Sequence, residues 1–221
     1  MATYVLVHGG NMSTDTWNKL AKRNDYPPGG NLGARYWDGT VSALTARNHR
    51  VFAPTLLDEH SSSLADHIDQ ICTLIAGNEL RDIILVGHSY GGMVITGVAA
   101  KMPERIHRLV YLDAALPDPN QSLYDILRLG LSASSGNQPV LPEPSPPYVE
   151  KLQFDPAKIE RLQKTYILCT KSEFKDVTRI AREKIAAAKK GWTYLELPSS
   201  HMPLADMPDG FLQLLLDAAK N

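Results

Sequence analysis

The stretch IILVGHSYGG, residues 83–92, joins four large apolar residues to a glycine-rich turn that contains one serine. Residues 83–86 have the length and character of a strand that is buried on both faces of a parallel sheet. Small and apolar residues continue over residues 89–102 and end before a proline, which predicts a buried helix. The G-x-S-x-G spacing therefore lies on a strand–turn–helix unit, and we expect Ser89 to project at the carboxyl end of the strand.

The same alternation of short apolar runs and helix-period segments extends along the whole chain. Expected strands cover residues 4–7, 50–53, 83–86, 109–112, 166–169 and 193–197, and expected helices cover residues 37–46, 64–76, 89–102, 177–188 and 211–219. Strands that alternate with helices predict an α/β fold with a parallel sheet and helices on both faces. We expect a single domain over residues 1–221.

Two stretches interrupt this alternation. Residues 23–36 are rich in glycine and proline and form an expected insertion loop of unassigned role. Residues 114–157 contain eight of the fifteen prolines of the chain. A gap of this length between two strands of a compact sheet is usually an insertion with a function of its own. We therefore expect residues 114–157 to form a lid that shapes the substrate site.

The composition excludes several classes of protein. The chain has 23 basic and 24 acidic residues and no basic stripe, so a nucleic-acid partner is not expected. Cys72 and Cys169 lie in apolar surroundings and are interpreted as buried thiols. No metal-ligand spacing or phosphate-binding motif occurs, so neither a metal nor a cofactor is expected. Without a signal peptide or an apolar span, a cytoplasmic protein with no membrane partner is expected. The sequence leaves open whether it is a monomer or a homodimer.

Four stretches together resemble the α/β-hydrolase superfamily. They are VLVHGG at residues 5–10, GHSYGGM at residues 87–93, LDAALPD at residues 112–118, and His201-Met202. They occur in the family's order and span nearly the whole chain. Within the superfamily they are similar to the small esterase group of plant methylesterases and hydroxynitrile lyases. The resemblance implies an α/β-hydrolase fold of about six mostly parallel strands, with the lid inserted between the fourth and fifth strands.

A serine nucleophile needs a histidine as its base. In α/β-hydrolases the order along the chain is serine, acid, histidine, and only His107 and His201 follow Ser89. His107 begins the fourth expected strand and so lies at the opposite end of the sheet. His201 follows the last strand, which makes it the predicted base. His8 and His88 are interpreted as hydrogen-bonded packing residues rather than catalytic ones.

Two carboxylates compete for the role of the acid that orients His201. Glu173 lies in the loop after residues 166–169, which is the usual position for this acid in the superfamily. Asp113 ends the preceding strand, and some lipases of the superfamily take their acid from that position. Either would accept a hydrogen bond from His201 and stabilise its charged form. The sequence leaves both alternatives open.

The oxyanion hole requires two backbone N–H groups that point at the developing negative charge. One is expected from Tyr90, which follows the nucleophile, and the other from Gly10 in the loop after the first strand. We expect Asn11, Met202 and Leu116 to contact the substrate. No metal ligand is expected among these residues.

Together these residues predict an enzyme that hydrolyses small-molecule carboxylic esters through an acyl-serine. His201 would take the proton of Ser89, and the histidine would later activate water. Related hydroxynitrile lyases carry a lysine after the catalytic histidine and a hydroxyl residue after the first-strand histidine. Met202 and Gly9 occupy these positions here, which argues for the esterase. A lyase, and a non-catalytic protein that binds a small molecule, remain the alternatives.

Overall fold

The computed structural model describes residues 1–132, 144–188 and 190–219, and six strands form a single sheet in it. The strand order is β2-β1-β3-β4-β5-β6, and every neighbouring pair is parallel. The strands are β1 (Thr3–Val7), β2 (Arg50–Phe52), β3 (Ile83–His88), β4 (Ile106–Leu112), β5 (Gln163–Cys169) and β6 (Trp192–Leu197). The predicted α/β fold is therefore confirmed.

Strands β4 and β5 each begin three residues earlier than the apolar runs predicted. Their first residues include polar ones, such as Arg108 and Lys164, which a search for apolar runs misses. Both side chains are buried, and the Arg108 guanidinium donates to the Thr165 hydroxyl at 3.1 Å. Pairing with the neighbouring strands, rather than apolar character, therefore sets where these strands start.

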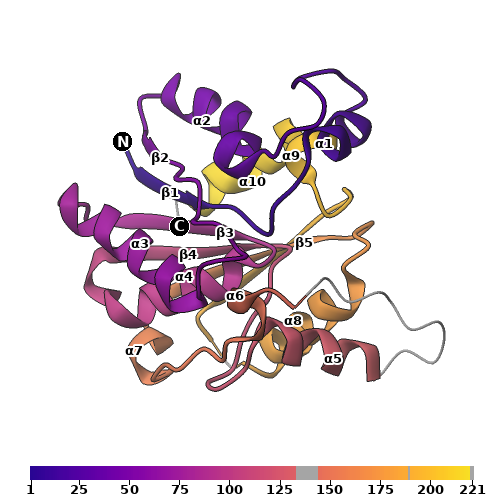
Figure 1. The fold of residues 1–221 in the computed structure, drawn as a ribbon. Coiled ribbons are helices and arrows are strands. Elements are labelled where there is room, and N and C mark those ends of the chain that lie inside the picture. Colours follow the sequence, from indigo (N-terminus) through magenta and orange to yellow (C-terminus); the bar gives the residue numbers. More distant parts are fainter. Residues whose placement is uncertain (133–143, 189, 220–221) are drawn as a thin grey trace.

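Helices cover both faces of the sheet (Figure 1). One face is covered by α1 (Thr14–Ala21), α2 (Asp38–Thr45), α9 (Pro203–Asp206) and α10 (Pro208–Ala218). The other face carries α3 (Leu64–Gly77), α4 (Gly91–Lys101), α5 (Leu123–Ser132), α6 (Pro146–Val149), α7 (Ala157–Glu160) and α8 (Lys175–Ala187). Each face has its own hydrophobic cluster. The helices α1, α5, α6, α7 and α9 were not among the expected ones. Of these, α6, α7 and α9 have four residues each, which is too short to show a helical period.

The unit of β3 and α4 lies at the centre of the molecule. All six residues of β3 are buried, and so are the first ten of the eleven residues of α4. The helix is made of small residues because its neighbours approach closely: a Cβ on Gly92 would overlap the carbonyl oxygen of Ala115. This tight packing holds the first turn of α4 directly beyond the end of β3, where Ser89 lies.

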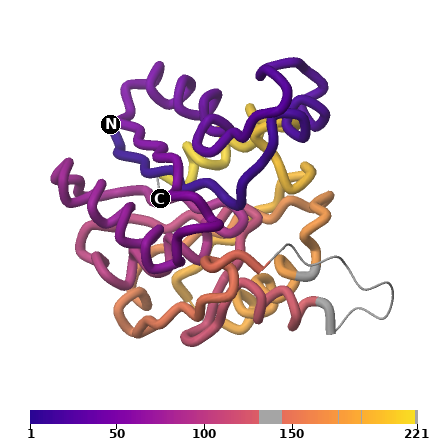
Figure 2. Tube along the Cα trace, viewed as in Figure 1, coloured from indigo at the N-terminus to yellow at the C-terminus, as the bar shows by residue number. Residues whose placement is uncertain are grey.

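The expected insertion, residues 114–157, contains α5 and α6 and ends at the first residue of α7, and its middle part, residues 133–143, lies outside the described residues. Gln121 and Leu152 form an antiparallel bridge that closes its base. The ammonium group of Lys184 in α8 lies 3.0 Å from a carboxylate oxygen of Asp118. In Figure 2 the described parts of the insertion run on the same side of the sheet as α3 and α4. Whether it acts as a lid stays a prediction.

Residues 23–36 follow α1 and include most of a 3₁₀ helix at Gly33–Trp37. An antiparallel bridge between Ser13 and Asn31 holds this loop against the start of α1. Tyr36, at the end of this stretch, is 2% exposed and packs in the interior. Across the described part of the chain, every helix is too short or too polar to span a bilayer.

Candidate active site

Ser89 occupies a strained turn between β3 and α4. Its φ of 55° lies in the left-handed region, which a residue with a side chain rarely adopts. A Cβ on Gly87 would lie 2.6 Å from the carbonyl oxygen of Gly91, and one on Gly91 would lie 2.8 Å from that of Val7. Only glycine fits these two positions, and this explains the spacing of the motif. The half-buried serine thus projects from the sharp turn at the carboxyl end of β3.

His201 and Asp113 are joined by a short hydrogen bond. Nδ1 of His201 lies 2.7 Å from Oδ2 of Asp113, whose side chain is fully buried. The other carboxylate oxygen of Asp113 accepts the N–H of Cys169 at 3.0 Å. In the neutral ring, a proton on Nδ1 that the carboxylate accepts leaves the lone pair of the second ring nitrogen free. The arrangement can therefore supply an oriented base beside the turn that carries Ser89.

Glu173 also lies beside His201, but it contacts the backbone rather than the ring. Its carboxylate accepts the main-chain N–H of His201 at 3.4 Å, and the residue is exposed. Of the two acids that the sequence left open, the structure thus brings Asp113 to the imidazole and Glu173 to the main chain.

The loop after β1 runs directly against the serine. A Cβ on Gly9 would lie 2.8 Å from the Cβ of Ser89, and a Cβ on Gly10 would lie 2.7 Å from the hydroxyl oxygen of Tyr148. The N–H groups of Gly10 and Tyr90 donate to no acceptor within the described ranges. Unpaired N–H groups beside a nucleophile can stabilise a negatively charged oxygen.

A chain of hydrogen bonds connects this loop to His201 through His88. The N–H of Gly9 donates to the Tyr36 hydroxyl, and that hydroxyl donates to Nδ1 of His88 at 3.1 Å. Nε2 of His88 lies 2.7 Å from the carbonyl oxygen of His201 and must carry the proton that this bond needs. Burial lowers the pKa of His88 well below its usual value, which keeps the ring neutral. Both ring nitrogens are therefore occupied, as expected for a packing residue.

His8 is likewise buried with both ring nitrogens paired. Nδ1 donates to the carbonyl oxygen of Gly9 at 2.8 Å, and Nε2 accepts the N–H of Leu56 at 2.8 Å. This second bond requires a neutral ring, because a protonated Nε2 cannot accept. Burial lowers the pKa of His8 from 6.5 to about 4.

We expect the free energy of unfolding to fall as the pH drops from about 6.5 to about 4. In this window the unfolded chain protonates His8 and the folded protein does not, so acid favours unfolding. The lowered pKa of His8 corresponds to about 3 kcal/mol in the free energy of unfolding. This stability is fully present above pH 6.5 and lost by pH 4. Urea unfolding at several pH values measures it. His8→Gln should weaken the pH dependence, whereas His107→Gln, at an exposed position of β4, should leave it unchanged. Equal pH dependence in His8→Gln and the wild type would contradict the assignment.

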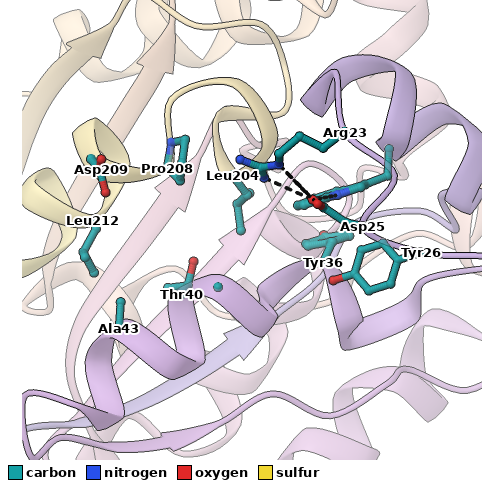
Figure 3. A pocket seen from close by; sticks show the side chains of 12 residues that line it. Arg23, Asp25, Tyr26, Tyr36, Thr40, Ala43, Leu204, Pro208, Asp209 and Leu212 are labelled. Carbon is teal, nitrogen blue, oxygen red and sulfur yellow. Dashed lines mark hydrogen bonds and ion pairs between the residues drawn. The ribbon is translucent and has the colours of Figure 1, made fainter.

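Two cavities flank this region. The first, of ≈ 310 Å³, lies between α2, α10 and the 23–36 loop, and the ion pair of Arg23 with Asp25 lies at its edge (Figure 3). Tyr36 lines it, but Ser89 and His201 do not. The second, of ≈ 480 Å³, adjoins the loop after β1. Its lining residues are His8, Gly9, Asn11, Asn31, Thr55, Leu56, Leu57, Asp58, Glu59, His60, His67 and Tyr90.

The three residues predicted to contact substrate lie in different surroundings. Asn11 lines the 480 Å³ cavity, and its N–H donates to a carboxylate oxygen of Glu59 at 3.2 Å. Leu116 packs in the cluster on the α3 and α4 face and borders a separate cavity of ≈ 260 Å³. Met202 is 2% exposed and packs in the cluster beneath α9 and α10. Their contacts with substrate stay predictions.

Sequence reasoning missed three polar residues that surround the loop after β1. They are Tyr36, Glu59 and Tyr148, which come from the 23–36 loop, the loop after β2 and helix α6. No spacing or periodicity marks them, because each reaches the site from a different short segment, far from the others in the sequence. Among the residues that the structure describes, no group of three or more His, Cys, Asp or Glu side chains could hold a metal ion.

Comparison with known proteins agrees with this architecture. Residues 4–214 match the model of the Alpha/beta hydrolase family. The carbendazim hydrolyzing esterase of Nocardioides sp. (strain SG-4G) is 38% identical over 135 residues, which cover 58% of this chain and 48% of that protein. The polyneuridine aldehyde esterase of Rauvolfia serpentina is 32% identical over 105 residues, 43% of this chain and 39% of that protein.

The similarity to solved structures extends over the whole chain. An extracellular alpha/beta-hydrolase from a Paenibacillus species superposes with a TM-score of 0.75 at 22% identity, with 100% of both chains covered. In contrast, the matched region spans about half the length, or less, of the two curated relatives. The structural likeness supports the fold, and the family match extends over nearly every element of the sheet and its helices. The chain therefore belongs to the alpha/beta hydrolase family.

Proposed function

We propose that this protein hydrolyses carboxylic esters of small molecules through an acyl-serine intermediate on Ser89. The observation that carries the proposal is the 2.7 Å bond between His201 Nδ1 and the buried carboxylate of Asp113. A buried carboxylate holds the imidazole in one tautomer and stabilises it when it is charged. Two curated relatives that are named esterases support the same reaction class.

In the first half-reaction, His201 takes the hydroxyl proton of Ser89 at its second ring nitrogen. The serine oxygen then attacks the ester carbonyl carbon, and the carbonyl electron pair moves to oxygen. The N–H groups of Gly10 and Tyr90 stabilise this oxyanion. When the tetrahedral intermediate collapses, the alcohol leaves with the proton held by His201, and the acyl group remains on Ser89.

In the second half-reaction, His201 takes a proton from water, and the resulting hydroxide attacks the acyl-serine carbonyl. A second oxyanion forms in the same place and uses the same donors, Gly10 and Tyr90. Its collapse releases the carboxylic acid and returns the proton from His201 to Ser89. Asp113 remains ionised throughout and balances the positive charge that His201 carries in each half-reaction.

The insertion at residues 114–157 is proposed to cover the site and select the ester. The support is the position of Tyr148, whose ring lies 5.0 Å from that of Tyr90 and whose hydroxyl adjoins Gly10. The 480 Å³ cavity beside Gly9 is large enough to accept one part of a small ester. A covered site would exclude water from the oxyanion and so strengthen its hydrogen bonds.

A fluorophosphonate probe tests the proposal directly, because it forms a stable bond only with an activated serine. We expect the folded protein to be labelled stoichiometrically, with the added mass on the peptide that contains Ser89. The same preparation should hydrolyse p-nitrophenyl acetate and lose that activity in step with labelling. The urea-unfolded protein and Ser89→Ala serve as controls, and neither should be labelled. A folded wild type that shows neither labelling nor turnover would refute the proposed function.

A further inference from the structure

Glu59 lies next to the loop that carries Gly10. One of its carboxylate oxygens accepts two hydrogen bonds, from the N–H of Asn11 at 3.2 Å and from the hydroxyl of Tyr148. Within the described ranges, no lysine or arginine forms an ion pair with Glu59. Its half-buried charge is therefore stabilised by these two donors, one of which belongs to the loop itself.

Tyr148 lies directly against Gly10. Its hydroxyl oxygen would lie 2.7 Å from a Cβ at Gly10, so it rests directly against that backbone. Its ring makes an edge contact with Tyr90, with 5.0 Å between the centroids. Tyr148 therefore touches both residues whose N–H groups would bind the oxyanion.

Helix α3 holds Tyr90 and the loop that carries Glu59. The hydroxyl of Tyr90 donates to Nδ1 of His67 at 2.9 Å, and Nε2 of His67 donates to the carbonyl oxygen of Leu57 at 3.0 Å. The second bond holds the loop that carries Glu59. On the side of Tyr148, the Glu150 carboxylate accepts the N–H of Leu64 at 2.6 Å, which attaches α6 to the start of α3. These contacts connect helix α3, helix α6 and the loop that carries Glu59 to one another around Gly10.

We propose that Glu59 and Tyr148 are positioning residues that hold the Gly10 and Tyr90 N–H groups in place for the oxyanion, and so couple the 114–157 insertion to the rate of the reaction. The inference rests on the proposed function and names two residues that determine how well the site performs it. Gly10 has no side chain with which to fix its own backbone. Its N–H points correctly only if neighbouring groups hold it, and an oxyanion donor is effective only when it is preorganised.

Steady-state kinetics with p-nitrophenyl acetate separates positioning from simple packing. Tyr148→Phe keeps the ring on Tyr90 and removes only the hydroxyl, and we expect kcat to fall about tenfold or more while KM changes less than threefold. Glu59→Ala should produce a similar loss. The double variant should lose little more than either single variant, because both remove the same contact.

Glu59→Gln tests the role of the acceptor oxygen. The amide oxygen can still accept from Asn11 and Tyr148, and the substitution removes a negative charge near the place where the oxyanion forms. It should therefore restore most of the kcat that Glu59→Ala loses. A trifluoromethyl ketone, which binds as a tetrahedral oxyanion on serine, should lose affinity in proportion to kcat in every variant.

The chain offers a matched control pair on the edge strand β6. The hydroxyl of Tyr194 donates to the carboxylate of Glu196 at 3.3 Å, so it has the same chemistry as the pair of Tyr148 and Glu59. Tyr194→Phe and Glu196→Gln should leave kcat and KM as in the wild type. An equal loss in these controls, or a change confined to KM in Tyr148→Phe, would overturn the inference.

Amide hydrogen exchange provides a readout that does not depend on activity. The exchange rate at Asn11 should rise about tenfold or more in Glu59→Ala and in Tyr148→Phe, and stay near the wild-type rate in Glu59→Gln. Unchanged exchange would refute the positioning role even if the enzyme is active. Suppose instead that exchange is faster in these variants but the fluorophosphonate does not label the wild type. That result would refute the proposed function, while Glu59 and Tyr148 would still be shown to hold the loop in place.

Discussion

Ser89→Ala is expected to lower kcat for p-nitrophenyl acetate by about 10⁴-fold or more. The substitution removes the oxygen that would form the acyl bond, so only binding and the oxyanion donors remain to assist water. Alanine and serine share the same Cβ, so the strained backbone at φ 55° is tolerated equally well. We therefore expect the variant to fold and to show the thermal stability of the wild type.

The measurement compares initial rates after subtraction of spontaneous hydrolysis. Ser42→Ala, on the exposed side of α2, is the matched control and should retain the wild-type rate. A rate within tenfold of the wild type for Ser89→Ala would show that another group performs the reaction. Reduced thermal stability together with lost activity would point to misfolding, and circular dichroism distinguishes the two cases.

Asp113→Asn is expected to lower kcat by about 10³- to 10⁴-fold. The asparagine oxygen can still accept the N–H of Cys169, so its NH₂ group must face Nδ1 of His201. Nδ1 then accepts a hydrogen bond and the proton moves to the other ring nitrogen, which can no longer act as a base. Asparagine also tolerates the positive φ of 43° at this position, so the loop should keep its shape.

Glu173→Gln is the control that distinguishes the two acids. Among the described residues, the side chain accepts only the main-chain N–H of His201, and a glutamine oxygen can accept that bond as well. We expect kcat to fall by no more than about threefold. The opposite result, with a large loss in Glu173→Gln and a small one in Asp113→Asn, would assign the acid to Glu173. Small losses in both would contradict the role of either carboxylate.

The elements of the fold could be predicted where their signal is local. Strand β3 and helix α4 were anticipated because the first four residues of the strand are all large and apolar, and because a proline follows the end of the helix. Helix α1 was missed although Trp17, Leu20 and Ala21 lie at helical spacing, because three apolar residues in a single turn make only a weak periodic signal. The early starts of β4 and β5 were missed because their first residues include polar ones.

The geometry around His201 shows the limit of such prediction. Asp113 and Glu173 are both close to His201, and the sequence offered no reason to prefer one. The N–H of Asp113 donates to the carbonyl oxygen of Ile167 at 2.8 Å, which continues the pairing of β4 with β5 beyond the end of β4. This bond fixes the backbone that directs the carboxylate toward Cys169 and the imidazole. Strand register therefore decides which acid reaches the ring.

The sequence by itself determined the turn that carries Ser89, since the strand, the glycines and the helix that shape it are adjacent in the chain. It also determined the α/β order of elements and the placement of His201 after the last strand. Only the tertiary structure decided which carboxylate meets His201 and which side chains surround Gly10. Asp113, Tyr36, Glu59 and Tyr148 come from four separate segments, and their contacts depend on how strands pair and helices pack.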